Sequence, residues 1–442
     1  MEKRILFIIF IVAIGVRIIA IHFTRGFNAP LWGDDIDYDR IALNLCCYGE
    51  GLTVWRVPLF PLYLTLIYSL FGYSHAIARL SLAIVGAINC ILIFVVTKEA
   101  FNKRAAYIST IIFMFYPPLV EWNAYLHSET LLTLLLTVSV LYMIRSAHTP
   151  STLNFILSGF FVGLASLTHP SAIILGLLTP VWALLTFKPN YKLALLAILC
   201  IFGSTIGTLS PWILRNYLIT GKFVPLTPYL GPTLIVTHNP VIATRLQQGS
   251  YKEKWEAPNW ISPEASGLLT STESTYVDRE WSFRYPAIGK NTKERELQAV
   301  ELDRFLRSKV VEYVRTHPGT NIKIALHQIP VFFHFYLPKS HKDEKLRLFC
   351  LGIYFVVLFL GIMGGIYSFN RRKCLWILYI LWIYGILIPL IFYARRRFRI
   401  PIELSIVVLS GMIIDKILSR SSKSKYISSK ITRLICGTFL WC

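Results

Sequence analysis

Residues 1–23 read MEKRILFIIFIVAIGVRIIAIHF, a short charged start followed by an apolar run from Ile5 to Phe23. A run of about 19 apolar residues is close to the roughly 20 that an α-helix needs to cross the hydrocarbon core of a bilayer. No small-residue cleavage site follows the run, as it would in a secretory signal peptide. The stretch therefore predicts an uncleaved first membrane span with Lys3 and Arg4 on the cytoplasmic side.

Similar apolar runs recur along the 442 residues and raise the number of predicted spans to ten, the others being 76–97, 105–120, 129–145, 153–168, 170–187, 192–209, 346–368, 374–393 and 401–418. Hydrophobic residues make up 55% of the chain and charged residues 16%, whereas a soluble domain has about 25% charged residues. The predicted fold class is therefore an all-α polytopic membrane protein with about ten transmembrane helices. The composition also excludes a disordered chain, a collagen-like chain and a small disulfide scaffold.

The formal net charge of +21 is better explained by basic cytoplasmic loops of a membrane protein than by nucleic-acid binding. Lys and Arg collect in cytoplasmic loops, which face a negatively charged leaflet, and no zinc-finger, basic-zipper or RNA-binding signature is present. Basic residues in the loops 98–104 and 188–192 and in the tail after Lys416 predict that both termini are cytoplasmic. The eight cysteines include no CxxC pair and predict neither a disulfide framework nor a zinc site.

Two shorter apolar segments are predicted to lie at the membrane surface. Residues 58–72 are short and interrupted by prolines, which is typical of a surface or re-entrant helix. Residues 322–337 carry Lys323, His327 and Pro330. If that segment crossed the bilayer, the basic C-terminal tail would lie outside, so the charge rule favours an interfacial helix.

The predicted organisation has three parts. Residues 1–209 form a transmembrane core with a catalytic first outer loop, 24–75. Residues 210–345 form a larger extracytoplasmic segment that includes an amphipathic helix at 293–316. Residues 346–442 form the last membrane helices and a basic cytoplasmic tail.

The densest polar cluster lies in the first outer loop, where residues 32–40 read WGDDIDYDR. Four carboxylates within six residues fit a solvated acidic loop or a helix start whose acids complement the helix dipole. They also fit a general base or a metal site facing the membrane surface, although the spacing of a calcium-binding loop is absent. Ionisable residues are nearly missing from the middle of the spans, which counts against a secondary transporter or proton pump.

A basic run, Arg395-Arg396-Arg397-Phe398-Arg399, precedes the last predicted span and is placed outside by the span count. The positive-inside trend does not explain basic residues on that side. Binding of a phosphate group explains them better, because the arginine fork matches phosphate oxygens at two points. Other polar residues at the outer span ends have simpler explanations. Glu129 fits a helix-start acid, His169 a turn residue and Arg215 an interface arginine.

Taken in order, these motifs resemble the superfamily C (GT-C) glycosyltransferases that use polyprenyl-phosphate sugars, in particular the protein O-mannosyltransferase, aminoarabinose transferase and Rgt-like branch. The motifs are Asp34-Asp35-x-x-Tyr38, Ala42 with Leu45 and Gly49, Arg56-Val57-Pro58-Leu59-Phe60-Pro61, Phe71-Gly72, Arg79-Leu80, Tyr116-Pro117, Glu129, Leu167-Thr168-His169-Pro170, Pro211-Trp212 with Arg215-Asn216, Gly221, and Arg397-Phe398-Arg399-Ile400-Pro401. The sequence departs from the family pattern at His169, where relatives usually have Arg, at Asp35, where many have Glu, and at Ile402-Glu403-Leu404, where a second Pro is common.

The resemblance implies an inverting enzyme that moves a sugar from a polyprenyl-phosphate carrier to a lipid, glycan or protein acceptor on the extracytoplasmic face of the cell membrane. It implies catalytic roles for Asp34 and Asp35, with Asp37 as a further candidate base. The implied donor-phosphate ligands are Arg399, Arg397 and Arg215, and the residues implied to line the cavity are Asp37, Tyr38, Glu129, His169 and Asn216. Some relatives bind a divalent ion, but the residues indicate no metal ligand set, and no cofactor or nucleic-acid partner is predicted.

Two other functions remain open at this point. A flippase or transporter of lipid-linked sugars would need polar groups near the midplane or two repeated halves, and neither is evident. An O-antigen ligase or polymerase-like enzyme would use a diphosphate-linked donor and typically a large outer loop with Arg and His. The acidic first loop argues against that second alternative.

Overall fold

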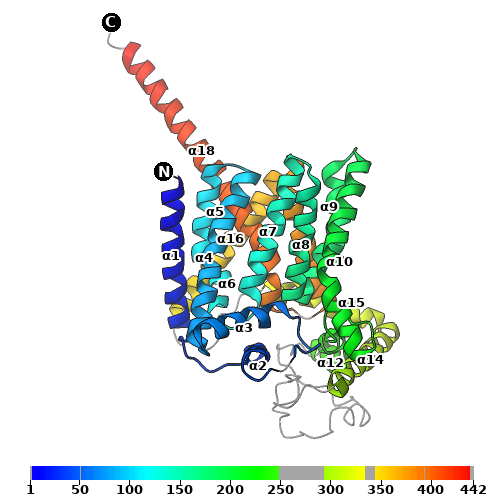
Figure 1. The fold of residues 1–442 in the computed structure, drawn as a ribbon. Coiled ribbons are helices and arrows are strands. Elements are labelled where there is room, and N and C mark those ends of the chain that lie inside the picture. The colour runs from blue at the N-terminus through cyan, green and yellow to red at the C-terminus, as the bar shows by residue number, and fades with distance from the viewer. Residues whose placement is uncertain (1, 50, 248–292, 334–343, 393, 439–442) are drawn as a thin grey trace.

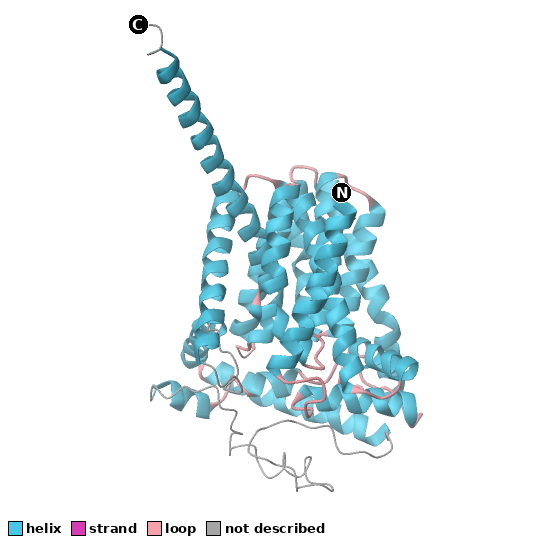
Figure 2. Cartoon of the chain, turned by 90° about the vertical axis from the view of Figure 1, so that its left-hand side faces the viewer, coloured by secondary structure: helices cyan, strands magenta, loops and turns pink. Residues whose placement is uncertain are grey.

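A computed structural model describes residues 2–49, 51–247, 293–333, 344–392 and 394–438 of the chain. Every regular element among these residues is a helix, as the apolar runs predict (Figure 2). The long helices lie side by side in one bundle (Figure 1). They are α1 (Glu2–Thr24), α4 (His75–Ala100), α5 (Lys103–Phe115), α7 (Glu129–His148), α8 (Thr152–Thr168), α9 (Ile173–Phe187), α10 (Tyr191–Thr220), α16 (Glu344–Ser368), α17 (Trp376–Ile391) and α18 (Ile400–Thr438).

Helices that follow one another in the sequence pack together, as α7 does on α8 and α4 does on α5. The last helix returns to the first half of the bundle, because α18 packs against α5 as well as against α16 and α17. This return brings the residues just before α18 next to the loops of the N-terminal half.

Within the described ranges, seven helices are long and apolar enough to cross a membrane, and the predicted count of ten is not reached. The other three predicted spans are helical but shorter or more charged. α5 has 13 residues and ends before Tyr116-Pro117-Pro118, because proline lacks an N–H and favours an extended residue before it. α8 has 17 residues, and α18 carries Glu403, Asp415 and Lys416 in its apolar half.

Most of the short helices gather at one end of the bundle, whereas α1 begins and α18 ends at the other (Figure 1). The short elements are α2 (Asp34–Cys47), α3 (Leu59–Phe71), α6 (Pro117–Val120), η1 (Glu121–Ala124), η2 (Pro170–Ala172), α11 (Leu230–Ile235), α12 (Pro240–Gln247), α14 (Lys293–Thr316), α15 (Pro318–Phe333), η4 (Lys373–Leu375) and η5 (Arg396–Arg399). Of these, η4 connects α16 to α17 at the opposite end of the bundle, where Lys373 donates to the Lys188 carbonyl (2.6 Å).

The two segments predicted to lie at the membrane surface form helices shorter than a span. α3 has 13 residues and α15 has 16, fewer than the roughly 20 residues of a typical straight span. Residues 334–337 of the predicted interfacial segment lie outside the described residues.

Helix α2 is fastened to α3 by side-chain contacts on its buried face. The Tyr38 ring meets the Phe60 ring edge-on at a centroid distance of 4.9 Å. The Asp39 carboxylate accepts hydrogen bonds from the hydroxyls of Tyr68 (2.6 Å) and Tyr73 (3.0 Å). Gly33 precedes α2 with a φ of 63°, a conformation that glycine adopts readily, and so lets the chain turn into the helix. These contacts fix the direction in which the first turn of α2 presents its carboxylates.

Candidate active site

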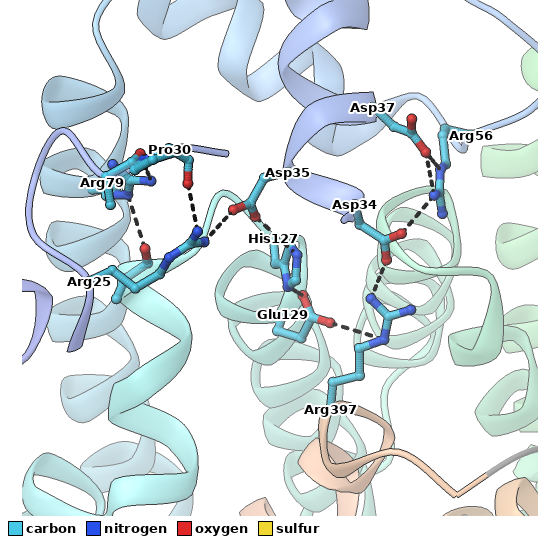
Figure 3. Close-up of polar contacts among 12 residues, drawn as sticks. Arg25, Pro30, Asp34, Asp35, Asp37, Arg56, Arg79, His127, Glu129 and Arg397 are labelled. Carbon is cyan, nitrogen blue, oxygen red and sulfur yellow. Dashed lines mark hydrogen bonds and ion pairs between the residues drawn. The ribbon is translucent and has the colours of Figure 1, made fainter. Parts of the chain in front are cut away.

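The first turn of α2 holds Asp34 between two arginines from distant parts of the chain (Figure 3). Arg56 Nη2 lies 2.8 Å from Asp34 Oδ1. Arg397, from the η5 turn, donates from Nη1 to the other Asp34 oxygen. The sequence separation between Asp34 and Arg397 is 363 residues, so the pair exists only because α18 returns to the N-terminal half of the bundle.

Arg56 also holds Asp37, one turn further along α2. Its Nη2 and Nε lie 2.6 Å and 3.2 Å from Asp37 Oδ2. The guanidinium lies over the rings of Tyr38 at 5.5 Å and Tyr229 at 5.0 Å. Arg56 therefore bridges two carboxylates of α2 and also contacts two aromatic rings.

Asp35 points to a different set of partners, toward α7 (Figure 3). Its Oδ2 lies 2.7 Å from Arg25 Nη1, and its Oδ1 lies 3.0 Å from His127 Nε2. The other ring nitrogen of His127 is 3.9 Å from Glu129 Oε2, and Glu129 Oε1 is 3.8 Å from Arg397 Nε. A chain of alternating charges thus links Arg25 to Arg397 beneath α2.

Asp34 and Asp37, the two carboxylates that Arg56 bridges, have pKa values shifted in opposite directions. Burial disfavours the Asp34 carboxylate, but Arg397 and Arg56 outweigh burial and hold the pKa of Asp34 well below its ordinary value. Burial prevails over the pairing with Arg56 at Asp37 and raises the pKa of that group. Asp34 is therefore the firmly ionised member and Asp37 the more basic one.

The carboxylates around His127, beneath α2, favour the charged form of its ring. Burial disfavours the imidazolium, but the carboxylates of Asp35 and Glu129 outweigh burial and raise the pKa of His127. At His169, in contrast, burial and the nearby Arg397 lower the pKa to about 3. The site therefore contains one histidine that favours a positive charge and one that is neutral at physiological pH.

Arg399 lies apart from this cluster and inside the bundle. Its side chain is 1% exposed, it pairs with Glu403 one turn along α18, and its Nη1 donates to the carbonyl of Phe332 (2.9 Å). The hydroxyl of Tyr116 donates to the other Glu403 oxygen (2.7 Å). Of the two arginines predicted as leading phosphate ligands, Arg397 thus reaches the α2 carboxylates, and Arg399 anchors the start of α18.

The remaining predicted site residues have local partners. Arg215 donates to the side-chain oxygen of Asn216 (3.1 Å) and lies over the Trp212 ring, while the Asn216 amide donates to the Val224 carbonyl (3.1 Å). His169 Nδ1 lies 2.8 Å from the Ser171 hydroxyl. The His169 ring also contacts the ring of Phe398, the residue that follows Arg397, at a centroid distance of 5.5 Å.

Three residues of the cluster were given no role from the sequence: Arg25, Arg56 and His127. Arg56 opens one of the quoted motifs, and His127 lies two residues before Glu129, so both carried a signal. Arg25 directly follows the first span and is indistinguishable in the sequence from an arginine at the membrane interface.

The assembled groups suit transfer chemistry next to a phosphate. A carboxylate at the start of α2 can accept a proton, and a partly exposed guanidinium can bind phosphate oxygens at two points. Within the part of the chain that the structure describes, no group of three or more His, Cys, Asp and Glu side chains is arranged to hold a metal ion.

Comparison with solved structures identifies proteins whose fold resembles that of this chain. The chain resembles, over 97% of its length, the archaeal oligosaccharyltransferase AglB from Archaeoglobus fulgidus, solved with an inhibitory peptide and a dolichol-phosphate, with a TM-score of 0.57 and 14% identity. An Archaeoglobus fulgidus oligosaccharyltransferase tethered to an acceptor peptide gives a TM-score of 0.55 at 14% identity, and the match covers 95% of this chain. These matches cover 52% and 50% of the two oligosaccharyltransferase chains, so the present chain spans about half the length of those structures.

ArnT from Cupriavidus metallidurans, solved with undecaprenyl phosphate, matches with a TM-score of 0.43 and 14% identity over 97% of this chain and 81% of its own. No protein in the curated set matches the chain. Residues 56–208 match the family model described as dolichyl-phosphate-mannose-protein mannosyltransferase. This match confirms, for the segment it covers, the family resemblance that the motifs indicate.

Proposed function

We propose that the protein is an inverting glycosyltransferase that moves a sugar from a polyprenyl-phosphate carrier to a lipid, glycan or protein acceptor on the extracytoplasmic face of the membrane. The observation that carries the proposal is the pairing of Asp34 with Arg397 among buried ionisable groups at one end of a membrane bundle. A base and a phosphate-binding cation side by side are what this reaction requires. The family match over residues 56–208 supports the same chemistry.

In the proposed reaction the acceptor hydroxyl attacks the anomeric carbon of the carrier-linked sugar. The bond between the acceptor oxygen and that carbon forms as the bond from the carbon to the phosphate oxygen breaks, so the configuration inverts. The hydroxyl proton passes to Asp34 acting as general base. The negative charge that develops on the leaving polyprenyl phosphate is stabilised by Arg397.

The ion pair in the free protein has a consequence for this step. While Arg397 and Arg56 both hold Asp34, its carboxylate is a weak base, because the low pKa reflects the two positive charges. A donor phosphate that engages Arg397 removes one of those charges from Asp34 and raises its basicity. Donor binding would thereby prepare the base, and neighbouring Asp37, with its raised pKa, is the alternative proton acceptor.

The phosphate ligand favoured by these contacts is Arg397. Its side chain is 15% exposed, whereas that of Arg399 is 1% exposed and satisfied by Glu403. Arg399 and Arg215, the other candidates from the sequence, would act on the phosphate only after rearrangement of their present contacts. Glu129, Tyr38, His169 and Asn216 remain proposed as residues around the substrates.

The proposed topology has ten membrane passes with both termini in the cytoplasm and the α2 cluster outside. It is supported by the helical state of all ten predicted segments and by the positions of α1's start and α18's end, opposite the cluster (Figure 1). The basic residues at that opposite end agree with the positive-inside trend.

The proposed function is tested by transfer from polyprenyl-phosphate-linked sugars with protein purified in nanodiscs. Asp34→Asn is expected to lower transfer by roughly 10²–10⁴-fold, the contribution of a positioned base. Asp39→Asn is the matched control on the same helix. The asparagine oxygen can still accept the hydrogen bond from the Tyr68 hydroxyl, so this variant should transfer sugar at a nearly normal rate. Normal turnover in Asp34→Asn together with loss in Asp37→Asn would move the base one turn along α2.

A further inference from the structure

Glu296, at the start of α14, contacts a loop 242 residues away in the sequence. The residue is 2% exposed. Its Oε2 accepts hydrogen bonds from the Val54 backbone N–H (2.8 Å) and from the Thr53 hydroxyl (3.3 Å). A buried carboxylate that accepts two such bonds forms a strong, charge-assisted contact.

The loop that Glu296 holds has no helix or strand of its own between residues 51 and 58. Its backbone groups are bonded to side chains instead. The Trp55 N–H donates to the Thr53 hydroxyl (3.1 Å), and the Thr227 hydroxyl donates to the Trp55 carbonyl (2.5 Å). Because no ladder of backbone bonds maintains this conformation, these side-chain contacts determine it.

Apolar and aromatic contacts add to the same attachment. Val54 is fully buried in a small cluster with Val224 and Val300, and Val300 lies one turn after Glu296 on α14. The Trp55 ring meets the Tyr229 ring edge-on at 4.9 Å. Residues of α14 and of the segment 224–229 therefore both pack against the loop.

Arg56 follows directly in this loop and contacts both Asp34 and Asp37. Its position relative to α2 depends on the backbone of residues 53–55. We infer that Glu296 is a positioning residue for the transfer reaction, which acts through the Val54 N–H to hold Arg56 against Asp34. This inference rests on the proposed function for its consequence in catalysis, but the contact itself can be tested without any sugar substrate.

The test measures how fast a water-soluble carbodiimide with an amine nucleophile modifies Asp34 in the full chain in nanodiscs, read by peptide mass spectrometry across pH. An ionised, paired carboxylate is protected, and loss of the Arg56 contact should expose it. Glu296→Ala is expected to speed Asp34 modification about tenfold, as the loss of a hydrogen bond to a charged group would do. The midpoint of the pH profile should move upward, because Asp34 loses a positive neighbour.

Three variants separate positioning from a general loss of structure. Glu296→Gln should stay close to the wild type, because its amide oxygen can still accept from Val54. Thr53→Val, a milder change, should shift modification in the same direction by a smaller factor. Glu301→Ala, an exposed acid on the same helix, should have no effect.

A double-variant comparison provides the decisive result. If Glu296 acts through Arg56, then Glu296→Ala adds little to the effect of Arg56→Gln. Unchanged Asp34 modification in both Glu296→Ala and Thr53→Val, or fully additive effects with Arg56→Gln, would overturn the inference. Wild-type protein that transfers no polyprenyl-phosphate-linked sugar while the modification data hold would instead refute the proposed function and leave the contact standing.

Discussion

Replacing Arg397 with alanine should weaken the binding of a polyprenyl phosphate by roughly 10- to 100-fold. Two unit charges about 4 Å apart attract by about 4 kcal/mol at the effective dielectric of a partly buried site. In the free protein, however, the guanidinium already pairs with Asp34 and lies 3.8 Å from Glu129 Oε1. The phosphate gains only the difference, about 1.5–3 kcal/mol, which is the usual value of a hydrogen bond to a charged group. At about 1.4 kcal/mol per factor of ten, this gives the stated range.

The assay is equilibrium binding of undecaprenyl phosphate to the purified protein in nanodiscs. Arg397→Lys should fall between the wild type and Arg397→Ala, because lysine keeps the charge but loses the two-point contact. Arg304→Ala is the control, since Arg304 is an exposed arginine on α14. Wild-type affinity in Arg397→Ala would refute the assignment of this residue to the donor phosphate.

Three further measurements address the bundle, its orientation and its pH response. Glu403→Ala should lower the free energy of unfolding by about 3–5 kcal/mol, because it leaves a buried arginine unpaired. Thermal unfolding in detergent measures this loss, and an unchanged melting temperature would contradict it. Cysteines placed at Arg372 and within residues 421–430 should resist a membrane-impermeant maleimide on intact cells, and rapid labelling at either place would overturn the cytoplasmic assignment. His127 has a raised pKa, so its stabilisation is complete below the unfolded value of about 6.5 and is lost as pH rises through the folded value. His127→Gln should therefore remove a fall in melting temperature that the wild type shows as the solution becomes alkaline.

The sequence by itself determined the class of protein and the positions of its helices. Apolar runs of about 20 residues predict membrane helices, because a helix forms all backbone hydrogen bonds within its own segment, as the lipid interior requires. Among the residues that the structure describes, each of the ten predicted runs lies mainly in helices. The acidic cluster at residues 32–40 was recognisable as well, since its carboxylates crowd within one short stretch directly after the first span.

Span lengths were harder to judge from the sequence alone. The run 105–120 looks continuous in hydropathy, but the helix stops at Phe115 because Pro117 cannot supply a backbone N–H to it. Apolar character continues past the break, so a hydropathy window does not register it. The Tyr116-Pro117-Pro118 motif nevertheless indicates where the helix ends.

Only the tertiary structure decided which arginine meets the catalytic candidate. Arg397 and Arg399 are two residues apart in one basic run, and the sequence offers no reason to prefer Arg397. In the tight η5 turn, with about three residues per turn, their side chains leave in different directions. One reaches Asp34 and the other enters the bundle to pair with Glu403. The sequence shows residue types and local periods, whereas pairing across 363 residues depends on how the helices pack and on which side of a turn each side chain leaves the backbone.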